Sequence, residues 1–225
     1  MNEDTSRKRG PGRPRKADAG DTKAALRQAA LRLFARQGYA GTSIRAIAGE
    51  VGLSDSVLYA HFASKQAIFD AVLAEYGPQS SADALASVDL HLADTDPPLF
   101  LRDLVRAFLD EWDNRESRLL ISLMARDGLL HGPGLREALS VMRASVADLF
   151  DRWIRAGHIP AHLGTPQALA LSFTGPIGLT RILHLHADAA HRERATAREE
   201  ILQHVETFTR AVFERGVPSR TNPTT

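Results

Sequence analysis

The sequence predicts an all-α protein, and three observations support that fold class. Apolar residues recur at intervals of three and four along most of the chain between residues 21 and 215. Glycine and proline separate these periodic segments, where they end one helix and allow the next to begin. No stretch shows the alternation of apolar and polar residues that a half-buried strand requires. We therefore expect a series of helices joined by short turns.

The composition is that of an ordinary globular chain with one or two domains. The 225 residues are 44% hydrophobic and 24% charged. No apolar run reaches the roughly 18 residues of a membrane span, and the N-terminus lacks the apolar segment of a secretory signal, so we expect a cytoplasmic protein. The absence of cysteine excludes disulfides and thiolate metal sites. With a net charge of +1, any affinity for nucleic acid must come from local clusters of charge.

Residues 1–20 form such a cluster. Six basic residues and no acidic residue lie between Arg7 and Lys16, and interspersed glycine and proline disfavour a helix. We expect this arm to be disordered in isolation. Its core, with Arg13 and Arg15, resembles an AT-hook, a thin basic peptide whose arginines enter the narrow minor groove of A·T-rich DNA. The alternative is a solvated tail without a binding role.

The next segment predicts a helix followed by a helix-turn-helix. The first helix should run from Asp21, as N-cap, to Gln37, with Gly38 ending it. In the next helix, one apolar face carries residues at i, i+3, i+4 and i+7, after Thr42 or Ser43 as N-cap. Gly52 then suits a left-handed turn, and Leu58 and Phe62 would point inward from the second short helix. The apolar face of the first short helix comprises Ile44, Ile47, Ala48 and Val51.

Residues 22–69 resemble the DNA-binding domain of TetR-family transcriptional regulators. The matching segments are LFARQGY at 33–39, GTSI at 41–44, IAGEVG at 47–52 and LYAHFASK at 58–65. The resemblance implies that the second short helix enters the major groove of DNA, where small side chains let the backbone approach base edges. It also implies a set of DNA-contacting residues: Thr42, Ser43, Arg45, Ser54, Asp55, Ser56, Val57, Tyr59, His61 and Lys65.

Two of these residues have alternative interpretations. His61 would touch a phosphate together with Tyr59, or it would be a partly buried packing residue. Asp55 departs from the family, in which this position is often neutral or basic. A carboxylate there repels phosphates, although it is able to accept a hydrogen bond from the N4 amine of cytosine.

The C-terminal part of the chain predicts a helical body that dimerises. The segment from Ala168 to Leu185 is apolar nearly all round, so it must be buried on more than one side. The resemblance implies a homodimer through the last two helices, near residues 166–187 and 196–215. A dimer also matches two-fold half-sites about 34–36 Å apart. The alternative is the central helix of a monomeric bundle.

The resemblance further implies a pocket for a small-molecule effector within the body. Large apolar residues between residues 99 and 187 are candidates for its lining, although each also fits an ordinary core. The candidates are Trp112, Met124, Met142, Phe150, Trp153 and Phe173.

We found no catalytic motif, and the histidines lack the spacing and partner carboxylates of a metal site, so we expect neither an enzyme nor a cofactor. The predicted organisation is a basic arm at 1–20, a helix-turn-helix domain at 21–66, a ligand-binding and dimerisation domain at 67–218, and a flexible tail at 219–225. The implied function is a repressor that binds a palindromic operator and is released by an effector. An activator, an architectural A·T-rich DNA-binding protein, and a helical enzyme or carrier are the alternatives.

Overall fold

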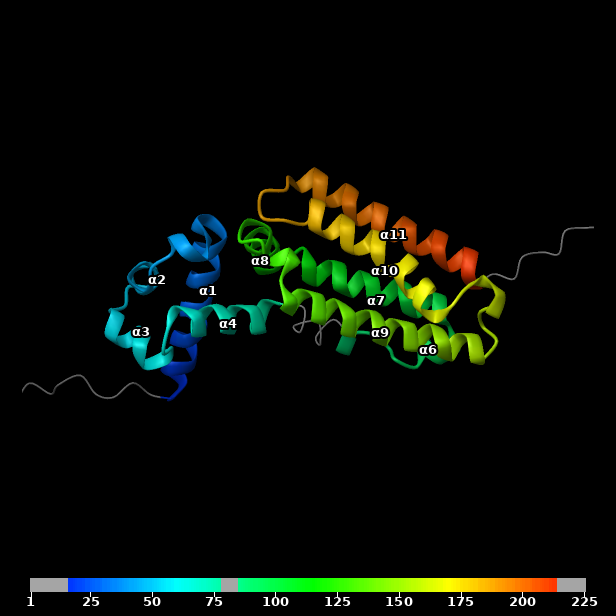
Figure 1. Ribbon diagram of the computed structural model, residues 1–225, viewed down its shortest axis with the longest axis horizontal. Coiled ribbons are helices and arrows are strands. Elements are labelled where there is room, and N and C mark those ends of the chain that lie inside the picture. Colours follow the sequence, from blue (N-terminus) through cyan, green and yellow to red (C-terminus); the bar gives the residue numbers. More distant parts are fainter. Residues whose placement is uncertain (1–15, 78–84, 214–225) are drawn as a thin grey trace, which may run out of the picture.

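A computed structural model describes residues 16–77 and 85–213, and throughout these ranges its regular structure is helical, which confirms the all-α prediction (Figure 1). Most of the basic arm, including Arg13 and Arg15, and the predicted tail at 219–225 lie outside the described residues. Within the described part of the chain, no helix is both long and apolar enough to span a membrane.

The N-terminal head consists of four helices: α1 (Lys16–Gly41), α2 (Ile44–Glu50), α3 (Asp55–His61) and α4 (Lys65–Tyr76). Our prediction of the start of the first helix was wrong, because α1 begins at Lys16 and Asp21 is not its N-cap. Lysine and alanine favour helix at these first positions, and they extend it past the expected boundary. The interruption at Gly38 is confirmed, since its φ of 76° and ψ of 165° are not helical.

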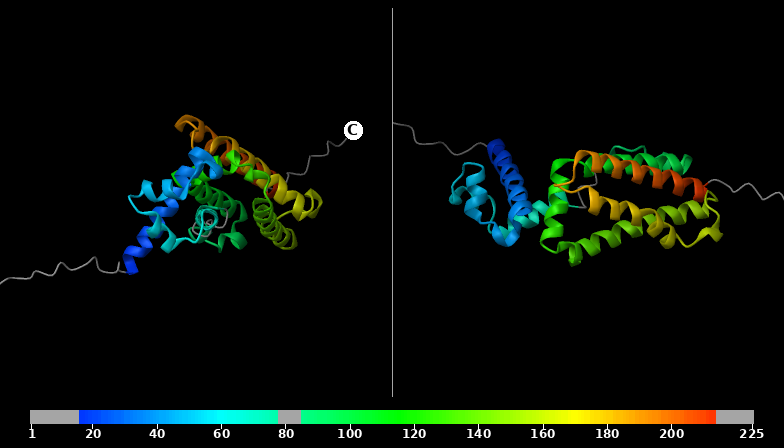
Figure 2. Two further views of the ribbon diagram at one scale, coloured as in Figure 1. Left: turned by 60° about the vertical axis from the view of Figure 1, so that its left-hand side comes forward. Right: turned by 90° about the horizontal axis from the view of Figure 1, so that it is seen from above.

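The body contains α6 (Leu92–Thr95), α7 (Pro97–Trp112), α8 (Arg115–Arg126), α9 (Pro133–Arg155), α10 (Pro166–His184) and α11 (His191–Phe213). Two short 3-10 turns, Leu129–His131 and Ala161–Leu163, lie beside α9. The long helices α7, α9, α10 and α11 lie side by side, whereas α8 crosses the end of the body nearest the head (Figures 1 and 2).

The predicted cap of α10 is confirmed. Thr165 is its N-cap, its hydroxyl accepts a hydrogen bond from the Ala168 N–H at 3.2 Å, and Pro166 occupies the first turn. The last helix, α11, begins at His191, five residues before the expected Thr196. The two helices expected to mediate dimerisation are therefore present, joined by a short loop that Figure 1 shows at the end of the body near α8.

Two hydrophobic cores organise the molecule, and their division does not follow the predicted domains. One core lies within the body and contains Phe150, Trp153 and Phe173. The other contains the buried residues of α1 to α4 together with Leu120 and Leu123 of α8. The head therefore shares its core with a body helix that begins about forty residues after the head ends.

Candidate nucleic-acid interface

The turn between α2 and α3 is closed by backbone hydrogen bonds around Gly52. Its φ of 69° is left-handed, a conformation that glycine adopts without strain. The Leu53 N–H donates to the Ala48 carbonyl at 2.9 Å, and the Gly52 N–H donates to the Gly49 carbonyl at 3.1 Å. These two bonds make a Schellman motif, which satisfies the last carbonyls of α2 and fixes where α3 begins.

The inner faces of the two short helices pack as predicted. Ile47, Ala48 and Leu58 are fully buried, and Phe62 is almost so. They join the core beneath α1 and α4, so α3 is held on one side and free on the other.

The free side of α3 carries most of the predicted DNA-contacting side chains. Ser54, Ser56, Val57 and Tyr59 are exposed, and Tyr59 retains 53% of its accessible surface. The Ser54 and Ser56 hydroxyls are 2.8 Å apart and hydrogen bonded to each other. The outer face of α3 thus offers two hydroxyls and a phenol, groups that hydrogen bond to base edges or phosphates.

Asp55 has a partner that the sequence did not reveal. Its carboxylate lies 3.6 Å from the guanidinium of Arg45 on α2, and the Arg45 side chain is largely exposed whereas the Asp55 side chain is partly exposed. The two residues line a shallow depression between α2 and α3 together with Gly49, Leu53, Ser54 and Ser56. The ion pair offsets the acidic charge within this surface.

Thr42 does not belong to the exposed surface. It is only 2% exposed, and its hydroxyl donates to the Gly38 carbonyl at 2.8 Å. Its side chain therefore satisfies a carbonyl that the break in α1 leaves free, and the predicted hydroxyl contact with phosphate is incorrect. The neighbouring Ser43 is exposed and is the N-cap of α2, accepting from the Ala46 N–H at 3.1 Å.

Lys65 also contributes to the α1–α2 junction. Its ammonium donates to the Tyr39 carbonyl at 2.7 Å and to the Thr42 carbonyl at 2.9 Å, and it lies over the Tyr39 ring. A lysine ammonium has three donors, so one remains for a phosphate. His61 is half-buried in the last turn of α3, which is compatible with either interpretation of its role.

The sequence did not reveal that α8 anchors the head. Asp127, directly after α8, accepts a hydrogen bond from the Tyr39 N–H at 2.7 Å, and Arg126 donates to the Arg36 carbonyl. Gly38 has to be glycine here, because an added Cβ would lie 2.9 Å from the Asp127 Oδ1 and its φ is positive. The end of α8 therefore holds the interrupted end of α1.

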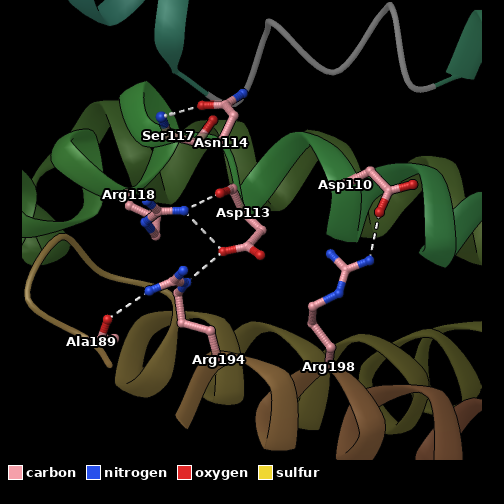
Figure 3. A network of polar contacts seen from close by, with 8 residues as sticks. All are labelled: Asp110, Asp113, Asn114, Ser117, Arg118, Ala189, Arg194 and Arg198. Atoms are coloured by element: carbon pink, nitrogen blue, oxygen red, sulfur yellow. Dashed lines mark hydrogen bonds and ion pairs between the residues drawn. The ribbon is translucent and has the colours of Figure 1, made fainter. Parts of the chain in front are cut away.

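The opposite end of α8 is tied to α11, as Figure 3 shows. The Asp113 Oδ1 accepts from Arg118 Nη1 at 3.0 Å and from Arg194 Nε at 2.8 Å. Arg194 also donates to the Ala189 carbonyl at 2.7 Å, while Asn114 caps α8 by accepting from the Ser117 N–H. A second pair, Arg198 with Asp110, joins α11 to α7 beside this network.

The structure does not bring the six predicted pocket residues together. Phe150, Trp153 and Phe173 are buried in the body core, and Met124 belongs to the core shared with the head. Met142 is exposed on α9. Trp112 is half-buried at the end of α7, with the guanidinium of Arg181 over its ring. A single pocket lined by all six is therefore incorrect.

The outer face of α10 presents an uncovered apolar stripe. Leu171, Leu179 and Leu183 are 55%, 60% and 52% exposed, whereas Leu169 and Ile177 on the opposite face are buried. Gly175 lies within the stripe and has open space where a side chain would be. This arrangement suits close approach of another helix.

Among the residues that the structure describes, no group of three or more histidine, aspartate and glutamate side chains is arranged to hold a metal ion.

Comparisons with known proteins agree with this geometry. Residues 26–72, which span most of α1 to α4, match the family described as bacterial regulatory proteins, tetR family. An uncharacterised HTH-type transcriptional regulator of Bacillus subtilis, YerO, is 30% identical over 93 residues, which are 41% of this chain and 32% of YerO. The match thus spans about a third of the length of that curated relative.

Solved structures extend the likeness to the whole fold. A TetR-family transcriptional regulator from Pectobacterium atrosepticum superposes with a TM-score of 0.62 and 21% identity, covering 90% of this chain and 99% of the other. The flavonoid-responsive regulator FrrA superposes with a TM-score of 0.55 and 23% identity, covering 87% and 99%. The family that matches the head is one of regulatory proteins, in agreement with the expectation that the chain is not an enzyme. The head of this chain thus matches the tetR family of bacterial regulatory proteins over residues 26–72, and the described chain shares its fold with solved structures of similar architecture.

Proposed function

We propose that this protein is a homodimeric transcriptional repressor that binds a palindromic operator and is released by a small-molecule effector. The main support for DNA binding is the outer face of α3, on which Ser54, Ser56 and Tyr59 are exposed. The inner face of the same helix packs into the core of the head. Its target is chromosomal DNA, so we place its action in the cytoplasm.

The proposed DNA contacts divide into two kinds. Ser54, Ser56, Val57 and Tyr59 face the major groove from α3, where direct contacts to base edges confer sequence preference. Ser43, Arg45 and Lys65 flank α3, and His61 lies in its last turn. Contacts from these residues to phosphates would set the depth and register of α3 in the groove. Asp55 reduces the positive charge of this surface, because its carboxylate pairs with Arg45.

Dimerisation through α10 and α11 is supported by the uncovered stripe on α10. Full burial of one leucine side chain is worth about 1.5–3 kcal/mol, so three half-exposed leucines from each of two copies give a substantial drive for association. The alternative of a monomeric bundle leaves this stripe in water, because α9 and α11 already pack against the other faces of α10.

We propose that the effector acts through α8. Asp113, just before this helix, binds Arg118 of α8 and Arg194 of α11, and Asp127, just after it, binds the Tyr39 N–H of α1. A shift of α8 would therefore move the head relative to the dimerisation helices. To take the population from 99:1 to 1:99, the effector must prefer the non-binding arrangement by about 5.5 kcal/mol. FrrA, whose name describes a flavonoid-responsive regulator, is an example of this fold coupled to a small molecule.

Footprinting on the DNA upstream of the protein's own gene, repeated across a salt series, tests the proposal. We expect a protected two-fold palindrome whose affinity falls steeply with salt, because several phosphates are neutralised. Tight binding to any A·T-rich fragment, abolished by deletion of residues 1–20, would support the architectural alternative. Reporter expression with and without the gene then separates repression from activation.

A further inference from the structure

Arg181 on α10 differs from the other arginines with a sealed Nε atom. In the described part of the chain, four arginines have a buried Nε without a hydrogen-bond acceptor: Arg27, Arg102, Arg118 and Arg181. The first three still form ion pairs, with Glu75, Glu206 and Asp113 respectively. Arg181 forms no ion pair with any described residue. Its guanidinium therefore lacks the direct ion pair that buried arginines ordinarily form.

The surroundings of Arg181 are aromatic. Its guanidinium carbon lies 4.3 Å from the centre of the Trp112 ring, and Phe108 stacks against the same tryptophan with ring centres 5.5 Å apart. A cation over an indole face is favourable, but it does not replace the hydrogen bonds that a buried guanidinium loses. Two aromatic rings and one charged donor group thus lie together here, and ligand sites in proteins combine such apolar and polar groups.

Arg181 remains a cation in this environment. Burial lowers its pKa to about 10, and the nearby Glu111 carboxylate opposes that shift. Glu111 is itself engaged, because its Oε1 accepts from the Asn114 side-chain amide at 3.0 Å. A positive charge therefore persists at neutral pH beside Trp112.

We propose that Arg181 binds the anionic group of the effector, and that the effector is a small organic carboxylate whose apolar part lies against Trp112 and Phe108. This inference rests on the proposed effector-controlled function and names the chemical class of its ligand. A carboxylate accepts two parallel hydrogen bonds from a guanidinium, so a bound carboxylate would supply Arg181 with the ion-pair partner that it lacks.

The position of Arg181 connects it to the proposed movement. Trp112 directly precedes Asp113, which holds Arg118 of α8 and Arg194 of α11 (Figure 3). An acid bound at Arg181 therefore lies at the corner between α7 and α8, next to the network that fixes the orientation of α8.

Thermal unfolding with matched ligand pairs tests the inference. The probes are benzoate with benzamide, 2-naphthoate with 2-naphthamide, and hexanoate with hexanamide, each at the same concentration and ionic strength. We expect at least one acid to raise the Tm of the full chain by several degrees more than its amide, because a ligand that binds only the folded state stabilises it. If no acid exceeds its amide, the inference is overturned.

Three variants locate the effect. Arg181→Met removes the charge with little loss of volume, and Arg181→Gln serves the same purpose should the methionine variant fail to fold. Arg210→Met, at an exposed position on α11, is the matched control. We expect both Arg181 variants to lose the acid-specific shift and Arg210→Met to keep it. An unchanged acid-specific shift in a folded Arg181 variant contradicts the inference.

A DNA-binding measurement separates this inference from the proposed function. Without any acid, wild type and Arg181→Met should bind the operator equally, and only wild type should be released by the stabilising acid. Wild type that binds no operator at all refutes the proposed function, whereas the thermal shifts still decide the acid site. Acid and amide with equal shifts refute the acid site and leave operator binding standing.

Discussion

The outer faces of α3 and α10 both leave apolar side chains in water, yet they differ in composition and length. The face of α3, a helix of 7 residues, mixes Val57 and Tyr59 with serine hydroxyls, and an arginine–aspartate pair borders it. The face of α10, a helix of 19 residues, presents a continuous leucine stripe around Gly175. A short polar face suits a hydrated, charged duplex, and a long apolar face suits a second protein helix.

Because of this difference, the two proposed binding functions should be separable by substitution. The α3 face belongs to the head core, and the α10 face belongs to the body core. A substitution on one face should therefore leave the other function intact. The variants below test that separation, beginning with the largest expected effect.

Leu179→Glu should have the largest effect. A carboxylate in the middle of the α10 stripe would be desolvated in a dimer, so we expect a monomer in solution. Operator affinity should fall by about 10²- to 10⁴-fold, because the two heads no longer bind as a linked pair. Light scattering after size exclusion gives the mass, and fluorescence anisotropy gives the affinity.

The control for this variant is Leu139→Glu, at a similarly exposed leucine on α9. It should remain dimeric with unchanged operator affinity. A dimeric Leu179→Glu protein would mean that the stripe on α10 is not the interface.

Tyr59→Ala should have the next largest effect, and on DNA binding alone. We expect operator affinity to fall by about tenfold or more, in line with about 1–3 kcal/mol for a good direct contact. The dimer mass should not change, because Tyr59 lies on the head. Val141→Ala, at an exposed residue of α9, is the control. Unaltered operator binding by Tyr59→Ala would remove α3 from the interface.

Asp127→Ala addresses the link between the two regions. It leaves the part-buried Tyr39 N–H without its acceptor, and because a fully buried unsatisfied donor costs about 1–3 kcal/mol, we expect a loss toward the lower end of that range. We expect a lower Tm, weaker operator binding and faster amide exchange at the end of α1, with the dimer preserved.

Asp103→Ala, which removes only an exposed pair within α7, is the control and should change little. If Asp127→Ala weakened dimerisation as much as DNA binding, the two functions would not be separable at α8.

Asp55→Asn should have the smallest effect and the opposite sign. It removes an acidic charge from the DNA-facing surface and frees Arg45. An exposed pair is worth about 0.2–1 kcal/mol, so we expect a gain in affinity of up to about fivefold for all duplexes, with a steeper dependence on salt. If affinity instead fell only for the operator, and replacement of one G·C pair in the operator removed that fall, Asp55 would contact the cytosine of that pair.

The sequence predicted the elements that depend on local pattern. The hydrophobic periodicity and a glycine after Val51 were sufficient to predict α2, the turn and α3. The hydrogen bonds that close this turn join residues within five positions of each other, so a local pattern determines it. The cap and first turn of α10 followed from Thr165 and Pro166 for the same reason.

The remaining features depend on residues that are far apart in the chain. Tyr39 and Asp127 meet because α8 packs against α1, and Asp113 and Arg194 meet because α11 packs against α7. The hydrophobic periodicity of the sequence does not indicate such long-range pairs. Thr42 shows a second reason why the sequence alone did not predict the site fully. A hydroxyl before a helix fits a DNA contact and a carbonyl cap equally well, and only the broken end of α1 at Gly38 decides between them.

The mass of the protein–operator complex, measured by native mass spectrometry on a single palindromic site, tests the central claim most directly. We predict two chains per duplex for wild type, with no stable complex for Leu179→Glu at the same concentration. A complex containing one chain, or an equally stable complex formed by the monomeric variant, would contradict the account of two separate faces that act together on DNA.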